Sequence, residues 1–338
     1  MGIRKVLIVA KSPMKKASDV ASLLNFPTHS ETVAKVNRIT SYSQKIAENF
    51  FHHVESRKAS ELLEMPDADA FVSSFDLVVP IGGDGTFLAA ARHILNSNVL
   101  VLGVNSNPFV SKGYLLPVKY FPESYEYILS KAFRKILTDQ FKILRRKRFE
   151  FRQHNTGQSH LGLNDVLFGP NSLSNTVLYD FKTKLGDPTS IRSTGLLLYT
   201  GTGVTAWANS MHFVGPEKVK FIADRLGVNV SDKRIREILV ELDEQYQFNP
   251  SSNLMGYIHR EMIPTSEFES KEGHSDSFEV RVNSLDPVSA AIDGTVVGLQ
   301  KGEVFTVALT DQARDLSAVD ISAEELFTCD ADEDDLCP

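Results

Sequence analysis

The sequence predicts an α/β protein with a second, mostly β domain, and three observations support this fold class. Within the first 140 residues, apolar runs without alternation are separated by helical patterns, as expected for a parallel sheet covered on both faces. From about residue 141, short β-rich runs are separated by Gly, Pro, Asn and Asp, which is typical of antiparallel strands. The length of 338 residues exceeds what one core usually supports. We therefore expect an α/β domain at 1–140, a β domain at 141–312, and a C-terminal segment with an acidic tail at 313–338.

The first domain is predicted to alternate strands and helices. Its predicted strands are residues 6–10, 75–80 and 99–104, and its predicted helices are residues 41–63, 87–95 and 124–137. The long first helix is indicated by Ile46, Phe50 and Val54, which recur at a spacing of four. Ligands of open α/β sheets bind beyond the carboxyl ends of the strands, so we expect a binding site at that edge.

The second domain is predicted to be built from short strands with one helical insertion. The predicted strands are residues 149–151, 160–168, 176–182, 191–200, 254–259, 277–282, 288–292 and 304–310. Two amphipathic patterns, at 217–226 and 232–246, predict a helical insertion near residues 216–247.

The composition is that of a soluble globular chain and excludes several classes of protein. With 42% hydrophobic and 23% charged residues the chain is not disordered, and its net charge of −7 argues against a nucleic-acid partner. The one dense basic run, residues 142–148, is interpreted as a solvated strand. No apolar run approaches the roughly 18 residues of a membrane span. Cys329 and Cys337 both fall in the acidic tail, so we expect no cysteine metal site in the body of the protein.

The first chemical signal is the glycine-rich turn at residues 80–86, between a predicted strand and a predicted helix. Gly82, Gly83 and Gly85 would let backbone N–H groups approach a phosphate, towards which the following helix points its positive end. The turn also contains Asp84, which a phosphate would repel. We interpret Asp84 as a general base that accepts a proton from an attacking hydroxyl.

A second signal is the pair Asn164 and Asp165 on a predicted strand. An amide beside a carboxylate can form hydrogen bonds with a ribose diol and with the edge of an adenine. On the sequence alone, an Asx turn at the end of a strand is the more common explanation of such a pair, and both interpretations stay open.

The third signal lies in residues 192–207, where an apolar strand enters a Thr-Gly-Thr-Gly turn and a helix start. Such a turn would allow a ligand to approach closely, although a simple helix cap has the same composition. The spacing of Gly201, Gly203 and Ala206 also fits a Rossmann dinucleotide fingerprint. That interpretation is disfavoured because Asp224, the acid at a comparable distance, falls in a helical pattern and not at the end of a strand.

Taken in order, these motifs resemble the NAD kinase family. The resemblance runs from about residue 75 to 299, and its motifs are Gly-Gly-Asp-Gly-Thr at 82–86, Gly-Val-Asn at 103–105, Asn-Asp at 164–165, Thr-Gly-Val-Thr-Ala-Trp at 202–207 and Asp-Gly at 293–294. Only the first motif is shared with diacylglycerol kinases, sphingosine kinases and 6-phosphofructokinases. The forms at 103–108 and 193–207 are most similar to the branch of animal mitochondrial NAD kinases.

The resemblance implies a fold, a reaction and a set of site residues. The fold is a Rossmann-like α/β domain, of the NAD kinase and diacylglycerol kinase type, followed by a β-sandwich domain that binds NAD. The reaction is transfer of the γ-phosphoryl group of ATP, with Mg²⁺, to the adenosine ribose 2′-hydroxyl of NAD, giving NADP. Asp84 would be the base. The implied ATP-binding residues are Gly82, Gly83, Gly85 and Thr86, and the implied NAD-binding residues are Asn105, Asn164, Asp165, Thr202, Gly203, Thr205, Ala206 and Asp293.

Two other functions stay open at this point. A lipid kinase of the same superfamily would need an apolar acceptor pocket, against which the polar Asn164–Asp165 pair speaks, and a non-catalytic protein would bind the dinucleotide without using ATP. The resemblance implies a homodimer, and the charge and the apolar runs of the sequence argue against association with nucleic acid or membrane. The first predicted strand begins so early that the sequence offers no presequence and predicts a cytoplasmic protein, whereas the resemblance points to mitochondria.

Overall fold

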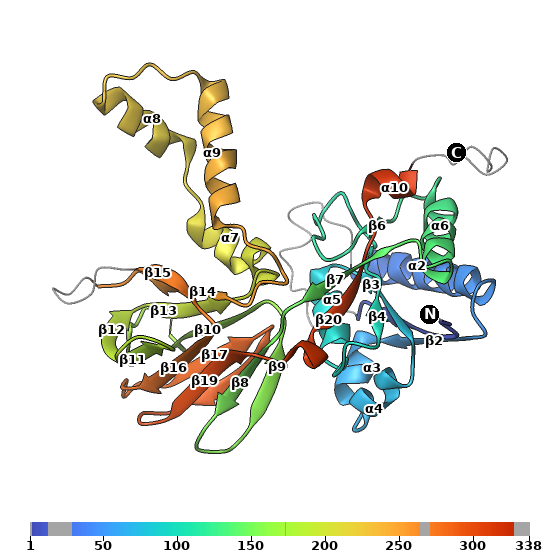
Figure 1. Cartoon of the computed structure of the whole chain (residues 1–338), viewed down its shortest axis with the longest axis horizontal. Coiled ribbons are helices and arrows are strands. Elements are labelled where there is room, and N and C mark those ends of the chain that lie inside the picture. The colour runs from blue at the N-terminus through green and yellow to red at the C-terminus, as the bar shows by residue number, and fades with distance from the viewer. Residues whose placement is uncertain (1, 13–28, 173, 264–270, 328–338) are drawn as a thin grey trace. The chain divides into compact units, whose positions relative to one another are not determined.

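A computed structural model of the chain describes residues 2–12, 29–172, 174–263 and 271–327 (Figure 1). The chain forms two compact units, of which the first combines Met1–Arg145 with Ala313–Pro338 and the second is Arg146–Gln312. Cys329, Cys337 and most of the predicted acidic tail lie outside the described residues.

The first unit is built on an eight-stranded sheet with the parallel core that the sequence predicts. Its strands run in the order β2-β1-β3-β4-β20-β7, and β5 and β6 extend the sheet beside β3. The strands are β1 (Lys5–Ala10), β2 (His53–Lys58), β3 (Leu77–Gly82), β4 (Leu100–Val101), β5 (Val104–Asn105), β6 (Val118–Lys119), β7 (Lys142–Arg146) and β20 (Leu316–Asp320). The pairs β1/β2, β1/β3, β3/β4, β3/β5, β5/β6 and β4/β20 are parallel, which confirms the α/β fold class.

Helices cover both faces of this sheet (Figure 1). They are α2 (His29–Glu48), α3 (Ala59–Glu64), α4 (Ala68–Ser73), α5 (Asp84–Ala91), α6 (Tyr125–Leu137) and α10 (Ala323–Phe327). Alternate strand residues such as Ile8 and Val79 form one core with Ile39 of α2 and Phe133 of α6. Because both faces are buried, the central strands are apolar throughout, and every residue of β3 is buried.

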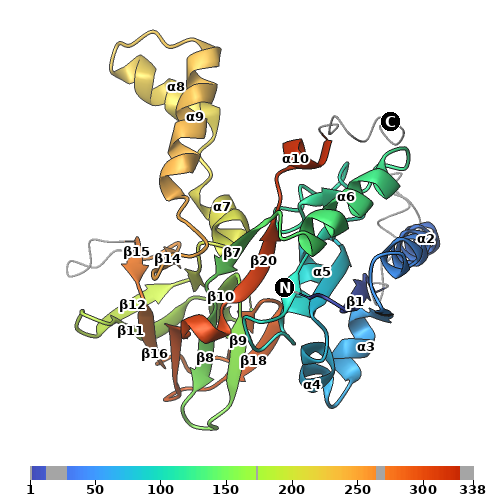
Figure 2. The same cartoon turned by 45° about the vertical axis from the view of Figure 1, so that its right-hand side comes forward.

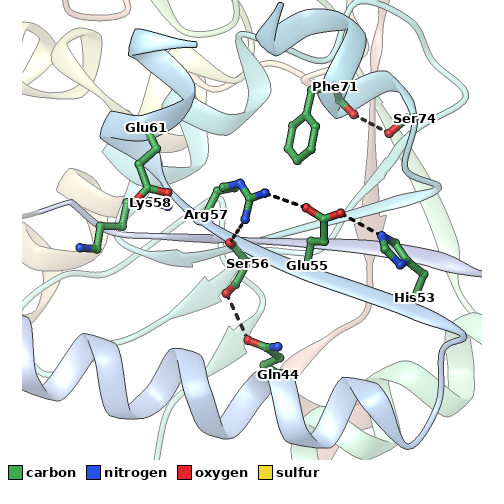
Figure 3. A network of polar contacts seen from close by, with 9 residues as sticks. All are labelled: Gln44, His53, Glu55, Ser56, Arg57, Lys58, Glu61, Phe71 and Ser74. Carbon is green, nitrogen blue, oxygen red and sulfur yellow. Dashed lines mark hydrogen bonds and ion pairs between the residues drawn. The ribbon is translucent and has the colours of Figure 1, made fainter.

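The predicted helix at residues 41–63 is wrong beyond Glu48. The structure has β2 and α3 there, and β2 lies at the edge of the sheet. Figure 3 shows why β2 lacks an apolar signal: Glu55 accepts from His53 at 3.0 Å and pairs with Arg57 at 3.0 Å, and Ser56 donates to Gln44 of α2 at 3.1 Å. Charged side chains are common on edge strands because they discourage pairing with other chains.

The other predicted elements of the first unit are confirmed with shifted bounds. The strand expected at 75–80 extends to Gly82, and the helix expected from 87 begins at Asp84. The strand expected at 99–104 is divided into β4 and β5. β20 (Leu316–Asp320) was not predicted, and it lies between β4 and β7 in the sheet.

The basic run is a strand, but it is not solvated throughout. Residues 142–146 form β7, as expected. Arg148 is only 1% exposed, so a solvated position is the wrong interpretation for that residue.

The second unit is a β-sandwich, as the fold class predicted. One sheet has the order β15-β14-β13-β10-β17-β18 and the other β12-β11-β16-β19-β8-β9. The strands are β8 (Phe149–Gln153), β9 (Ser159–Gly162), β10 (Asp165–Pro170), β11 (Val177–Thr183), β12 (Thr189–Ser193), β13 (Gly195–Tyr199), β14 (Met255–Arg260), β15 (Glu272–Ser275), β16 (Ser277–Val282), β17 (Val288–Ile292), β18 (Thr295–Leu299) and β19 (Val304–Leu309). Side chains from both sheets, including Phe151, Phe168 and Tyr179, share one core.

The predicted helical insertion lies between β13 and β14. It contains α8 (Pro216–Arg225) and α9 (Asp232–Tyr246), which extend away from the sandwich in both views (Figures 1 and 2). Ser231 caps α9 by accepting the Arg234 N–H at 3.2 Å. A further short helix, α7 (Trp207–His212), was not predicted. In the described part of the chain, no helix combines the length and the apolar character that crossing a membrane requires.

Candidate functional site

The glycine turn joins β3 to α5, and its three glycines have different roles. A Cβ at Gly82 would lie 2.2 Å from Thr86 Oγ1, so the packing of the turn itself requires glycine there. A Cβ at Gly83 would meet only Ser111 Oγ at 3.9 Å, and one at Gly85 would meet no described atom within 4 Å. Gly83 and Gly85 therefore border open space beside the N-terminus of α5, where a phosphate could approach backbone N–H groups.

Asp84 is the first residue of α5 and is half-buried. Its Oδ1 accepts the Leu115 N–H at 3.1 Å, which fixes one carboxylate oxygen. Lys119 is close enough for the charge of Asp84 to raise the pKa of the lysine, although burial has the larger effect and lowers that pKa. Lys119 Nζ also donates to the carbonyls of Lys112 and Gly113, each at 2.9 Å. Asp84 in the turn therefore lies close to Lys119 of β6, which was not among the predicted site residues.

Asn105 lies next to the turn, because it pairs in register with Gly82 on one side and with Lys119 on the other. It is 1% exposed. Its Nδ2 donates to the Ser111 carbonyl at 2.8 Å and its Oδ1 accepts the Asn107 N–H at 3.0 Å. Both ends of the side chain therefore hold the loop that follows β5.

In the second unit, the predicted nucleotide-binding residues gather around the start of β10. Asp165 pairs in register with Tyr199, and the Thr200 N–H donates to the Asn164 carbonyl at 2.9 Å. The Asp165 carboxylate accepts the N–H of Trp207. The Asn164–Asp165 pair and the turn after β13, separated by more than thirty residues in the sequence, are therefore neighbours in the fold.

Thr200 connects these two segments, although it was not among the predicted site residues. It is fully buried, and its hydroxyl donates to the Leu163 carbonyl at 2.5 Å. The same oxygen accepts the N–H groups of Thr202 at 3.1 Å and Gly203 at 3.2 Å. A threonine at the end of an apolar strand gives no signal of its own, because the pattern is common at helix starts.

The remaining predicted residues of this turn lie close to the same segment. A Cβ at Gly203 would lie 2.1 Å from the Asn164 carbonyl oxygen, so only glycine allows the two backbones to approach so closely. Thr202 is buried and accepts from Arg146 Nη1 at 3.3 Å. Thr205 and Ala206 are partly exposed.

Two polar groups in this cluster suit a ligand. Burial and, to a lesser extent, the nearby charge of Asp293 raise the pKa of Asp165 to about 7, although the Trp207 N–H opposes the shift. Asn164 Oδ1 is buried and has no hydrogen-bond partner among the described residues, a costly arrangement unless something else supplies a donor.

A cavity of about 480 Å³ lies beside this cluster, within the second unit. It is lined by Trp207, Ser210 and Met211 of α7 and by Leu167, Ile258 and Arg260 of the sheet. Trp207 belongs to both features, since its N–H binds Asp165 and its side chain lines the cavity. The lining also includes the charged residues Glu261 and Lys271, so the cavity combines apolar and polar groups, as small-molecule sites do.

Asp293 lies in the two-residue turn between β17 and β18. Its φ is 44° and that of Gly294 is 85°, the backbone that an Asp-Gly hairpin turn favours. Its carboxylate accepts the N–H groups of Leu163 at 2.6 Å, Asn164 at 3.0 Å and Asp165 at 3.2 Å. All seven predicted residues of the second unit therefore lie in one cluster. Asp224 lies outside it, in α8, which agrees with the expected helix and disfavours the Rossmann interpretation.

Two solved structures have a similar fold. Yeast NADH kinase complexed with NADH aligns with a TM-score of 0.59 at 15% sequence identity, covering 96% of this chain and 85% of that one. An NAD kinase from Archaeoglobus fulgidus in complex with ATP aligns with a TM-score of 0.54 at 19% identity, covering 96% of both chains. The chain therefore shares its fold with these two proteins.

The sequence comparisons agree with the resemblance to the NAD kinase family. Residues 8–135 match the family model of the ATP-NAD kinase N-terminal domain. Human mitochondrial NAD kinase 2 is 26% identical over 250 residues, which cover 62% of this chain and 57% of the human protein. The chain thus spans less than two thirds of that relative. The resemblance to the NAD kinase family is confirmed.

Proposed function

We propose that this protein is an NAD kinase, which transfers the γ-phosphoryl group of ATP to the adenosine ribose 2′-hydroxyl of NAD and yields NADP. The observation that carries the proposal is Asp84, a carboxylate at the N-terminus of α5 in a turn where Gly83 and Gly85 border open space. The matched ATP-NAD kinase N-terminal domain, which includes this turn, supports it independently.

The first unit would bind and align the ATP phosphates. The N–H groups of the turn and the N-terminus of α5 favour negative charge. Lys119 adds a cation close to Asp84. Asp84 itself would accept the proton of the attacking hydroxyl, since its Oδ1 is fixed by Leu115 and its orientation does not depend on substrate. Phosphoryl transfer needs mainly such alignment and charge neutralisation.

The second unit would bind the acceptor nucleotide. The unpartnered Asn164 Oδ1 can accept from a ribose hydroxyl or an adenine amino group, and Asp165 can accept from the same groups when ionised. Thr205 and Ala206 are partly exposed beside them, and the cavity at Trp207 offers a surface on which an aromatic ring can stack. This polar acceptor site favours a nucleotide over a lipid.

Mg²⁺ would enter with the ATP phosphates, where it neutralises charge on the transferred group. Asp84 is the one acid in the turn at residues 80–86. Among the described residues there is no group of three or more His, Cys, Asp or Glu side chains that could hold a metal ion.

The decisive experiment supplies ATP and Mg²⁺ with NAD, NADH or a lipid acceptor and measures the phosphorylated product. An NAD kinase forms NADP or NADPH, a lipid kinase phosphorylates the lipid, and a non-catalytic protein binds dinucleotide without consuming ATP. Asp84→Asn should retain NAD binding and lose about 10²- to 10⁴-fold in kcat. Asp67→Asn, at an exposed acid of the same unit, is the matched control.

The similarity to NAD kinases also supports proposals about the oligomeric state and the cellular compartment. We propose a homodimer, which sedimentation of the purified chain would test. The human relative is named mitochondrial, which supports a mitochondrial location that fractionation of cells would test.

A further inference from the structure

We propose that Asp293 and Thr200 form a clamp on the backbone of residues 163–165, and that Asp293 acts by positioning this segment and does not contact the nucleotide. The inference rests on the proposed function, in which Asn164 and Asp165 bind the acceptor nucleotide. It changes the role of Asp293 from a ligand contact to a positioning residue.

Asp293 holds the N–H side of the segment. Its Oδ2 accepts from Leu163 at 2.6 Å, and its Oδ1 accepts from Asn164 at 3.0 Å and Asp165 at 3.2 Å. In the other direction, the Asp293 N–H donates to the Asp165 carbonyl at 3.2 Å. Three consecutive N–H groups that converge on one carboxylate form charge-assisted hydrogen bonds, which are stronger than neutral ones.

Thr200 holds the carbonyl side of the same segment. Its hydroxyl donates to the Leu163 carbonyl at 2.5 Å, and its N–H donates to the Asn164 carbonyl at 2.9 Å. The Thr200 oxygen also accepts from Thr202 and Gly203, which ties the segment to the turn after β13. The backbone of residues 163–165 is therefore bound from two sides by elements that are far apart in the sequence.

The arrangement requires a carboxylate at position 293 for a chemical reason. An ionised carboxylate only accepts hydrogen bonds, whereas an asparagine would place an NH₂ group against at least one of the three N–H donors. Burial raises the pKa of Asp293, while the three N–H groups and the charge of Arg148 favour the ionised form. These groups oppose the effect of burial without cancelling it, so the pKa of Asp293 stays above its ordinary value.

The consequence concerns the side chains that the clamp leaves available. Because the backbone of the segment is held by the protein, the Asn164 amide and the Asp165 carboxylate can be directed at a ligand without reorganisation. Asn164 Oδ1, which lacks a partner among the described residues, is the group such a clamp would present.

The first test is amide hydrogen exchange of the full-length protein without any nucleotide. Asp293→Asn and Asp293→Ala should speed exchange in the peptide that contains residues 163–165, with no change in the peptide from β16. Thr200→Val, which removes the hydroxyl at nearly constant shape, should speed it as well, and Thr200→Ser should restore protection. Asp286→Asn, at an exposed acid near β17, is the control. Unchanged exchange in the Asp293 variants would overturn the clamp.

The second test is a double-mutant cycle in NAD binding. Asp293→Asn should weaken NAD binding about 10- to 100-fold, the usual effect of a lost positioning group, and should leave the KM for ATP unchanged. If Asp293 acts through Asn164, the double variant Asp293→Asn with Asn164→Ala should bind NAD about as weakly as Asn164→Ala alone. Fully additive losses would show direct contact with the nucleotide and would overturn the proposal.

The two tests separate this inference from the proposed function. A wild-type protein that binds no NAD would contradict the NAD kinase proposal, yet the exchange experiment would still decide whether the clamp exists. Urea unfolding followed by the fluorescence of Trp207 shows which variants are folded at the assay temperature. Thr200→Val and Thr200→Ser provide the comparison if the Asp293 variants do not fold.

Discussion

Asp165→Asn should stabilise the sandwich unit at alkaline pH while weakening nucleotide binding. Asp165 is 6% exposed, and burial together with Asp293 raises its pKa from the ordinary 3.8 to about 7. The folded protein therefore binds the proton more tightly than the unfolded chain does, and Asp165 lowers stability increasingly as pH rises from about 4 to 7. Asparagine is neutral at every pH and keeps an oxygen that can accept the Trp207 N–H.

The size of the effect follows from the pKa difference. A change from 3.8 to about 7 corresponds to roughly 4 kcal/mol once the pH is well above 7. At pH 5 the carboxyl is mostly ionised in the unfolded chain and still protonated in the folded protein. Because this pH is only a little above 3.8, the loss of folding free energy is smaller there, roughly 1.5 kcal/mol. The advantage of the variant over wild type should thus grow by about 2 to 3 kcal/mol between pH 5 and pH 8.

The assay is urea unfolding at a series of pH values, followed by the fluorescence of Trp207. This residue is the one tryptophan of the chain and lies in the second unit, so its signal reports on the unit that contains Asp165. Comparison with wild type at each pH cancels the other titrating groups. A difference between the two proteins that does not change from pH 5 to pH 8 would refute the argument that Asp165 is held in a costly environment. Asp187→Asn, at an exposed turn of the same unit, is the control.

Three further predictions concern the two clusters. Gly82→Ala should lower the free energy of unfolding by about 1 to 3 kcal/mol, because the new Cβ would overlap Thr86. Gly85→Ala should leave the urea midpoint unchanged and raise the KM for ATP. Equal effects of the two changes would contradict the roles assigned to the two glycines. Lys119→Met should lower kcat about tenfold or more with little change in the KM for NAD, because it removes a cation beside Asp84, and steady-state kinetics would detect this. Gly203→Ala should raise the KM for NAD at least about tenfold, because its Cβ would displace the Asn164 carbonyl, and a normal KM in a folded variant would argue against that close approach.

Much of the fold could be predicted because the strongly patterned segments obey local rules. β16, β17 and α9 have the predicted bounds, since alternation or helical spacing and a capping serine mark them. β2 was hidden because an edge strand may be built from charged residues, which carry no apolar pattern. β20 was not predicted to join the first sheet, because no local feature of the sequence indicates that a strand after the second unit pairs with β4.

The candidate site shows the same division. Asp84 could be singled out because a phosphate would repel its carboxylate, so its presence in the glycine turn requires a chemical role. Asn164 and Asp165 were indicated by the resemblance to the NAD kinase family, since the pair by itself also fits an Asx turn. Lys119 and Thr200 could not, because a lysine on a short strand and a threonine after an apolar run are ordinary in sequence. Their importance arises from tertiary contacts, with Gly113 for Lys119 and with Leu163 for Thr200.

The position of β20 has a consequence for how the protein is made. A ribosome synthesises the chain from the N-terminus, so the whole sandwich, residues 146–312, emerges before Leu316–Asp320 does. Until then, the sheet of the first unit lacks the strand that separates β4 from β7. The sandwich can therefore fold during translation, while the first unit must wait for residues 316–320. Premature termination before residue 316 would leave β4 paired only with β3 and would expose its other, unpaired edge to other nascent chains.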